Sequence, residues 1–227
     1  MRLTERDTRL VRDVALSHAL CRDQFIALGY FSSVTRANTR LRELAGAGLL
    51  RPIATPFHSQ RIYVAGPRAL RVVGERISTL ISPRSETPRF LRHALCTASI
   101  RIAICAETGG DWRFEQQARV RFNFLGSDCE VRPDGLVIAG QRVIAVETDL
   151  GHTPSPKFAE RLRAYRSLAE SGRSRAAWGA DRFELLVVTT GPLRAARLRR
   201  LASREPGFAF RCESHDRLGV PFAGSWS

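Results

Sequence analysis

Lysine is almost missing from this chain, because Lys157 is the single lysine among 36 lysine and arginine residues. Codon bias is the simplest source of such a skew. Acidic residues are also few: there are 22 of them, so the formal net charge is +14 and the isoelectric point is near 11.1. Positive charge spread along a chain, rather than gathered in a tail, indicates a polyanionic partner. Nucleic acid is the first candidate, and an anionic membrane surface is the second.

Paired cysteines and long apolar runs are also missing. The five cysteines are scattered and form no Cys-x-x-Cys pair, which argues against a disulfide framework and against structural zinc. We expect them to be small buried hydrophobes in a reducing compartment. No segment approaches the about 20 apolar residues of a membrane span, and the first residues lack the apolar core of a signal peptide. These features predict a cytoplasmic protein.

Residues 1–81 predict a winged helix-turn-helix domain. Apolar residues recur at helical spacing in three segments, and two short strand-like segments follow them. The expected helices are 3–18, 22–28 and 33–45, and the expected strands are 49–53 and 61–64. Three helices followed by a β-hairpin are typical of a winged helix. A connecting helix is expected over 69–81, and residues 82–88 are the best candidate for a linker.

The third helix of this domain occupies the position of a DNA-recognition helix. Val34, Leu41 and Leu44 are expected on its inward side, which leaves polar and basic residues outside. Arginines four positions apart, with threonine and asparagine between them, suit contacts with phosphates and base edges in a major groove. An ordinary solvated helix face is the alternative. The candidate DNA-binding residues are Thr35, Arg36, Asn38, Thr39, Arg40 and Arg42 of the helix, with Arg61 beside the wing.

Residues 89–227 predict a second domain of the α/β class with a mixed sheet. Two apolar runs rich in β-branched residues, 136–139 and 143–146, are separated by Gly140-Gln141, which is typical of a β-hairpin. A nearly continuous apolar run at 183–190 indicates a buried strand with parallel neighbours.

Acidic residues mark both ends of the predicted hairpin. Asp134 precedes its first strand, and Glu147 and Asp149 end its second. A hairpin of this size brings its open ends together, so the three carboxylates are expected to converge. Mg²⁺ or Mn²⁺ requires such hard oxygen ligands, usually one or two carboxylates completed by water and substrate phosphate.

Pro133-Asp134, a spacer of β-forming residues and Glu147 resemble the signature of the PD-(D/E)xK nuclease fold, with Asp149 where the signature has lysine. Together with the winged helix, this pattern makes most of the chain, from near Leu3 to near Thr190, similar to the replication-relaxation family. That family comprises winged-helix proteins related to the mobilisation-protein C relaxases of plasmids. The resemblance implies a restriction-endonuclease-like second domain. It also implies a nickase dependent on Mg²⁺ or Mn²⁺ that acts on double-stranded DNA at the origin or transfer region of a mobile element.

The same resemblance implies roles for individual residues. Asp134 and Glu147 are the expected metal ligands, and Glu115 is a candidate for a further carboxylate, with a solvated strand-end residue as the alternative. Asp149 is unable to replace an ammonium group, so we expect it to be a further ligand or an acceptor that orients an arginine. Lys157, at the start of the next helix, is the candidate for the missing positive charge.

Two questions stay open in the sequence. Strand-end carboxylates often form ion pairs, and an arginine-rich chain offers many partners. A non-catalytic DNA-binding regulator of replication or transcription is therefore the alternative to the enzyme. Tyr165 resembles the tyrosine nucleophile of another relaxase class, but its place on an apolar helix stripe favours the core. A second copy of the chain is a further candidate partner.

Overall fold

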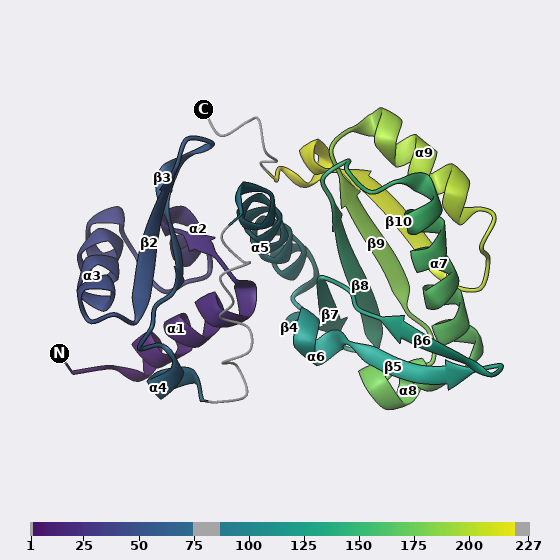
Figure 1. Ribbon diagram of the computed structural model, residues 1–227, viewed down its shortest axis with the longest axis horizontal. Helices are drawn as coiled ribbons and strands as arrows, with labels where there is room; N and C mark the ends of the chain where they lie inside the picture. The colour runs from purple at the N-terminus through teal and green to yellow at the C-terminus, as the bar shows by residue number, and fades with distance from the viewer. Residues whose placement is uncertain (1, 75–86, 221–227) are drawn as a thin grey trace. The chain divides into compact units, whose positions relative to one another are not determined.

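The computed structural model describes residues 2–74 and 87–220 of the chain. Within them the chain divides after Ile102 into two compact units, each with its own hydrophobic core. Both units mix helices and strands, which confirms the expected α/β class (Figure 1). The linker expected at 82–88 lies almost wholly outside the described residues, as does the second half of the connecting helix expected at 69–81.

The first unit has the winged-helix order expected from the sequence. Its helices are α1 (Glu5–Ser17), α2 (Arg22–Ala27), α3 (Val34–Gly46) and α4 (Leu70–Val73), and its strands are β1 (Leu20–Cys21), β2 (Leu50–Thr55) and β3 (His58–Ala65). β2 and β3 form the antiparallel wing, and β1 pairs with β3 to give the sheet order β1-β3-β2. The three helices and the hairpin predicted from periodicity are therefore confirmed.

The packing of α3 differs from the expectation at one position. Ala37, Leu41 and Leu44 are fully buried, whereas Val34 is 46% exposed. Val34 is the first residue of the helix, directly after the N-cap Ser33, and its side chain lies before the turn that meets the core. The inward stripe of α3 therefore starts one turn later than the sequence suggested.

Helix α5 (Pro88–Thr108) extends the first unit beyond the boundary expected at residue 89. Its N-terminal half buries Leu91 and Leu95 against Ile62 of β3. The side-chain amide of Gln24 also donates to the carbonyl oxygen of Leu95 at 2.8 Å. Most of α5 lies after the boundary expected at residue 89, yet this helix contributes to the core of the first unit, and the chain divides inside it.

The second unit is built on a five-stranded mixed sheet. Its strands, in spatial order, are β10 (Ala209–Ser214), β9 (Glu184–Thr189), β8 (Arg142–Asp149), β7 (Gly135–Ala139) and β4 (Asp111–Phe114). β7 and β8 form the predicted hairpin, with Ala139 opposite Arg142 across the turn. β9 has parallel neighbours on both sides, as its apolar run indicated.

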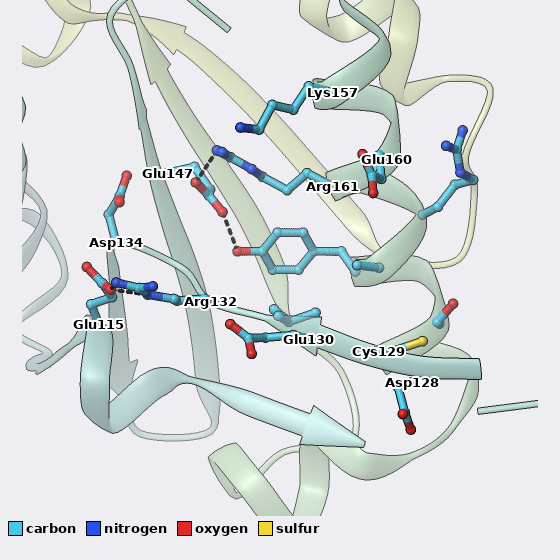
Figure 2. A pocket seen from close by; sticks show the side chains of 15 residues that line it. Glu115, Asp128, Cys129, Glu130, Arg132, Asp134, Glu147, Lys157, Glu160 and Arg161 are labelled. Carbon is cyan, nitrogen blue, oxygen red and sulfur yellow. Dashed lines mark hydrogen bonds and ion pairs between the residues drawn. The ribbon is translucent and has the colours of Figure 1, made fainter. Parts of the chain in front are cut away.

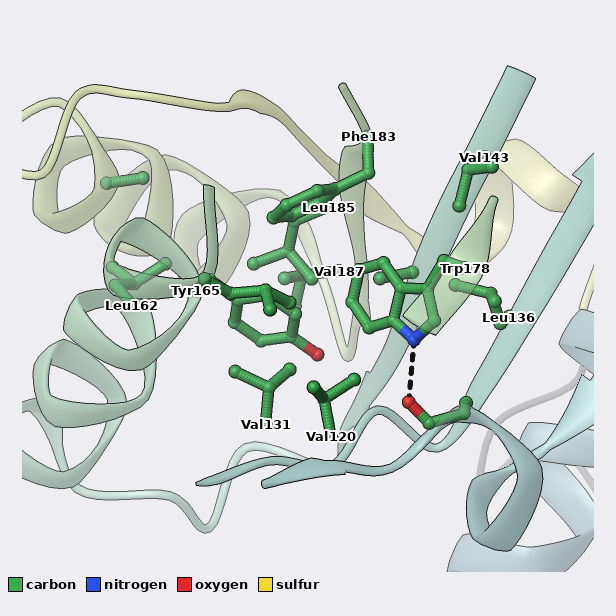
Figure 3. Packing of buried hydrophobic residues seen from close by; sticks show 14 of the residues in the cluster. Val120, Val131, Leu136, Val143, Leu162, Tyr165, Trp178, Phe183, Leu185 and Val187 are labelled. Carbon is green, nitrogen blue, oxygen red and sulfur yellow. Dashed lines mark hydrogen bonds between the residues drawn. The ribbon is translucent and has the colours of Figure 1, made fainter. Parts of the chain in front are cut away.

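Three helices of the second unit contribute to one apolar core with this sheet: α7 (Ser155–Glu170), α8 (Arg173–Trp178) and α9 (Pro192–Ala202). Leu162 and Tyr165 of α7 lie in this core with Leu185 of β9 (Figure 3). Trp178 of α8 is buried in the same core, and its Nε1 donates to the carbonyl oxygen of Ala118 at 2.8 Å. The expectation that Tyr165 lies in the core, based on its place on an apolar helix stripe, is confirmed.

A second hairpin, formed by β5 (Val120–Phe124) and β6 (Ser127–Val131), was not expected from the sequence. The short helices α6 (Glu115–Ala118) and η3 (His215–Leu218) were not expected either. The β5–β6 hairpin turns at Leu125 and Gly126, whose φ angles are 52° and 79°. Two-residue hairpin turns with positive φ at both positions usually carry Asn-Gly or Asp-Gly. Leucine rarely adopts that conformation, so the usual turn signal is missing here.

Candidate active site

The side chains of strand β8 that face the core form a row of alternate residues, and this row ends in two carboxylates. Alternate residues of a strand share a face, and Val143 and Ala145 of this row lie in the core. Glu147 and Asp149 continue the row, and each is only 3% exposed. Burying an ionised carboxylate costs free energy unless a cation and hydrogen-bond donors accompany it. Each acid therefore requires partners from the helices that pack on this face.

Glu147 has two partners on α7. The Arg161 guanidinium donates to Oε2 at 2.6 Å, and the Tyr165 hydroxyl donates to Oε1 at 2.8 Å (Figure 2). The charge of Glu147 raises the pKa of Arg161, so Arg161 remains a cation. Burial, aided by the Glu147 charge, raises the pKa of Tyr165 well above its usual value, so the hydroxyl keeps its proton. The Glu147 carboxylate is thus oriented through both of its oxygens.

Asp149 is held by a different helix. Arg194 of α9 donates to both carboxylate oxygens, at 2.8 and 3.2 Å, and the Thr189 hydroxyl donates at 2.8 Å. Burial alone would raise the pKa of Asp149, but these hydrogen bonds outweigh it and hold that pKa below its usual value. Asp149 therefore orients an arginine, which is one of the two roles expected for it.

A cleft of about 840 Å³ opens beside Glu147. The site residues predicted from the sequence that line it are Glu115, Asp134, Glu147 and Lys157. Asp149 is not among the described residues that line this cleft. Of the three carboxylates expected to converge, the structure thus brings together Asp134 and Glu147. It leaves Asp149 out because that acid, two residues farther along β8, forms its ion pair with Arg194.

Asp134 is positioned by the hairpin itself. It directly precedes β7 and is partly buried, and its Oδ2 accepts a hydrogen bond from the backbone N–H of Thr148 at 2.7 Å. This bond ties the start of β7 to the end of β8. It fixes Asp134 beside Glu147 on the neighbouring strand (Figure 2).

The cleft also holds charges that neutralise one another. Glu115, the first residue of α6, forms an ion pair with Arg132. Lys157 lies exposed in the first turn of α7, one turn before Arg161 on the same side of that helix (Figure 2). Arg161 was not among the site residues predicted from the sequence. Its position four residues before Tyr165 was an available signal, because residues four apart on a helix are neighbours.

The donor set of the cleft fits a hard divalent cation. In residues 2–74 and 87–220 no group of three or more His, Cys, Asp or Glu side chains is arranged to hold a metal ion. Mg²⁺ needs fewer protein ligands, because it usually binds one or two carboxylates and keeps water or substrate phosphate in its other positions. Asp134 and Glu147 supply two such carboxylates, and Arg161 is the cation that competes with a metal ion for Glu147.

Most of the predicted DNA-binding residues are exposed on the first unit. Along α3 the side chains of Thr35, Arg36, Thr39 and Arg42 are exposed and Asn38 is partly exposed, and Arg61 is exposed on β3. The buried face of the same helix faces the core through Ala37, Leu41 and Leu44. The polar face of α3 therefore remains open to solvent within this unit.

Arg40 differs from its neighbours on α3. Its guanidinium donates to both oxygens of Asp7, at 2.9 and 2.5 Å, and to Glu43 at 2.6 Å. Asp7 is fully buried in α1, where Thr4 also donates to it. Burial would raise the pKa of Asp7, but Arg40 and Thr4 lower it well below its usual range. Arg40 therefore joins α3 to α1, and its charge is committed within the protein.

Comparisons with known proteins bear on these features. A model of the family described as replication-relaxation matches residues 12–180, which is most of the chain and includes α3 and the cleft. No curated protein sequence matches the chain. Among solved structures, protein VC1899 from Vibrio cholerae is similar with a TM-score of 0.38 and 12% sequence identity, over 96% of this chain and 55% of that chain. A likeness of that size carries no argument. No helix of the described residues is long and apolar enough to cross a membrane.

Proposed function

Because the chain belongs to the replication-relaxation family, we propose that it binds double-stranded DNA of a mobile element and nicks it with the help of Mg²⁺ or Mn²⁺. The origin or transfer region of a plasmid is the target that this proposal implies. The observation that carries it is the cleft, where Asp134 and Glu147 face Lys157 and Arg161. Carboxylates that can hold a metal ion, with cations near enough to bind a phosphate group, suit metal-dependent phosphodiester cleavage.

The chemistry assigns a task to each of these residues. Asp134 and Glu147 would hold the metal ion, which when bound lowers the pKa of a coordinated water and neutralises charge on phosphate oxygens. Lys157 and Arg161 would bind the phosphate group and stabilise the negative charge that gathers on it in the transition state. Tyr165 keeps Glu147 in one orientation. Conversion of supercoiled plasmid into nicked circles, dependent on Mg²⁺ or Mn²⁺, tests this proposal.

The polar face of α3 is the proposed DNA contact of the first unit. Its exposed arginines suit phosphates or guanine edges, while threonine and asparagine side chains suit other base edges and phosphates. Arg61 on the wing strand would contact the DNA backbone. Arg40 is excluded from this set because Asp7 and Glu43 hold it.

We expect the double variant Arg36→Ala/Arg42→Ala to bind duplex DNA more weakly, because both guanidinium groups are exposed on α3. Each loss should cost about 1–3 kcal/mol of binding free energy if the side chain contacts a base. Fluorescence anisotropy with labelled duplex measures the binding free energy.

Arg40→Ala is the contrasting variant. It leaves Asp7 as a buried unpaired charge and should lower the free energy of unfolding by about 3–5 kcal/mol. Unchanged binding by the double variant would remove α3 from the interface.

Tyr165→Phe should still nick DNA, with a loss of no more than about 10–100-fold, because the hydroxyl orients Glu147. That hydroxyl is fully buried and protonated, so it is unsuited to attack a phosphodiester itself. The variant loses one hydrogen bond to the Glu147 carboxylate, which should lower the free energy of unfolding by about 1–3 kcal/mol. Urea unfolding and the plasmid assay measure the two effects separately. A covalent DNA–protein adduct formed by the parent and missing from Tyr165→Phe would contradict the assignment.

A non-catalytic regulator with a degenerate nuclease fold is the second candidate function. The observation that favours it is that both oxygens of Glu147 already accept hydrogen bonds, from Arg161 and Tyr165. Such a protein binds DNA through α3 but needs no metal ion. Calorimetric titration with Mn²⁺ separates the two functions, because an enzyme binds the ion through Asp134 and Glu147, and Asp134→Asn weakens that binding.

A further inference from the structure

The arginines of helix α9 fall into two sets. Arg194 and Arg199 are bound within the second unit: the first donates to Asp149, and the second donates to the carbonyl oxygen of Cys212 at 2.6 Å. Arg197 and Arg200 are exposed, as is Arg204 in the turn that follows the helix. Within residues 2–74 and 87–220 none of these three guanidinium groups has an ion pair or a hydrogen-bond partner.

The three exposed arginines follow one another closely in the chain. Arg197 and Arg200 are three residues apart and share one face of α9, because residues three apart on a helix are neighbours. Arg204 follows in the turn that begins directly after the helix. We name Arg197, Arg200 and Arg204 the α9 stripe.

No carboxylate neutralises the α9 stripe from its own helix, because α9 contains no Asp or Glu. Glu205, the next acidic residue after the helix, is already bound by Arg166 of α7 at 2.6 Å. Three uncompensated guanidinium groups this close in the chain repel one another unless an anion binds them. The stripe therefore fits a partner with several negative charges.

A membrane surface is a poor partner for this helix. Amphipathic helices that lie in a membrane interface bury an apolar face among the lipids. The apolar face of α9, formed by Ala195, Leu198 and Ala202, is already packed on the core of the second unit. Leu193, 88% exposed, is the one large apolar residue on the outer face of the helix.

We propose that the α9 stripe binds the phosphate backbone of duplex DNA, as a second contact surface separate from α3 of the first unit. Guanidinium groups pair with phosphate oxygens in bidentate geometry, and such contacts position a protein on DNA without reading its sequence. The stripe holds the second unit on the duplex, independently of the sequence that α3 contacts. This inference rests on DNA binding, one part of the proposed function, and does not require cleavage.

The salt dependence of binding by the full chain tests the α9 stripe. Each phosphate neutralised on duplex DNA contributes about −0.9 to the slope of log K against log salt concentration. The triple variant Arg197→Gln/Arg200→Gln/Arg204→Gln should therefore make the slope shallower by about 2–3. Its binding to random-sequence duplex should weaken as much as its binding to duplex carrying the element's own sequence, because backbone contacts are common to both.

A matched variant separates position from charge. Arg113→Gln/Arg173→Gln/Arg182→Gln removes the same number of positive charges from exposed sites of the same unit, and among the described residues these arginines also have no ion pair. It should leave the slope within about 1 of the parent value. Equal slopes for the two triple variants, or a parental slope for the α9 variant, would overturn the proposal. The proposal would also be overturned if the α9 variant binds DNA as strongly as the parent does but no longer binds vesicles of anionic lipid.

The same measurement distinguishes this inference from the proposed role of α3. If Arg36→Ala/Arg42→Ala binds normally while the α9 variant shows the shallower slope, the α3 proposal fails and the stripe stands. The reverse result removes the stripe and keeps α3. Near-ultraviolet circular dichroism and thermal unfolding confirm that each variant is folded, which we expect because all substituted side chains are exposed.

Discussion

Glutamine in place of Glu147, or asparagine in place of Asp134, should lower metal-dependent nicking by more than about 100-fold and leave DNA binding unchanged. Each change removes a negative charge that would hold the metal ion while keeping the size of the side chain. Changes in the outer shell of a metal site already cost about 10–100-fold, so loss of a ligand should exceed that range. The measurement is conversion of supercoiled plasmid carrying the element's own origin or transfer region into nicked circles.

Asp149→Asn is the matched control for these two variants. Asp149 lies on the same row of β8 as Glu147 and is equally buried, at 3% exposure, but its partner is Arg194 rather than a residue of the cleft. The variant weakens an ion pair in the core, so it should lower the free energy of unfolding by about 1–3 kcal/mol. Below its unfolding temperature it should nick DNA as the parent does. Loss of nicking in Asp149→Asn would instead make that acid part of the catalytic site.

The outcome for the parent protein decides between the two candidate functions. Nicking that requires Mg²⁺ or Mn²⁺ and disappears in Glu147→Gln supports the enzyme. DNA binding by the parent with no Mn²⁺ binding and no nicking of its own target supports the regulator. Activity of Glu147→Gln equal to that of the parent would contradict cleavage in this cleft.

The hairpin that positions the candidate site follows from local sequence. Two β-branched runs around Gly140-Gln141 were sufficient to place β7 and β8, since turn and strand signals act over a few residues. The same reasoning placed Asp134 and Glu147 at adjoining strand ends. The prediction was wrong for Asp149. Sequence spacing does not tell which helix supplies the cation that pairs with each acid at the end of β8, and Asp149 pairs with Arg194 of α9.

Long-range pairs account for the other differences between sequence and structure. Arg40 has the spacing of a DNA-contacting residue, yet its partner Asp7 lies 33 positions earlier in the chain. Arg161 lies in the cleft because α7 packs on β8, and nothing near Arg161 in the sequence identifies Glu147 as its partner. Ion pairs between elements depend on tertiary packing, whereas capping and turn signals do not.

Lys157→Ala should lower nicking by about 100- to 1000-fold if the lysine stabilises charge in the transition state, the range found for loss of one preorganised donor. Lys157→Arg should restore little of this activity. A guanidinium group is planar and bulkier than an ammonium group and almost never gives up a proton, so it does not reproduce a compact cation beside a metal-bound water. A lysine that merely attracts DNA would behave differently, because arginine would then substitute well. Plasmid nicking under single-turnover conditions measures the effect on the chemical step.

Arg163→Ala is the matched control, because Arg163 is an exposed cation of α7 that lines the same cleft. It removes one positive charge from the same helix and should keep nearly full activity, since neither Asp134 nor Glu147 is its partner. Equal losses in Lys157→Ala and Arg163→Ala would indicate general attraction of DNA rather than a specific role for the lysine. If Lys157→Arg is as active as the parent, the assignment to Lys157 is wrong. The remaining cation beside Glu147 is Arg161, bound to its Oε2 at 2.6 Å, and Arg161→Lys is then the variant to measure.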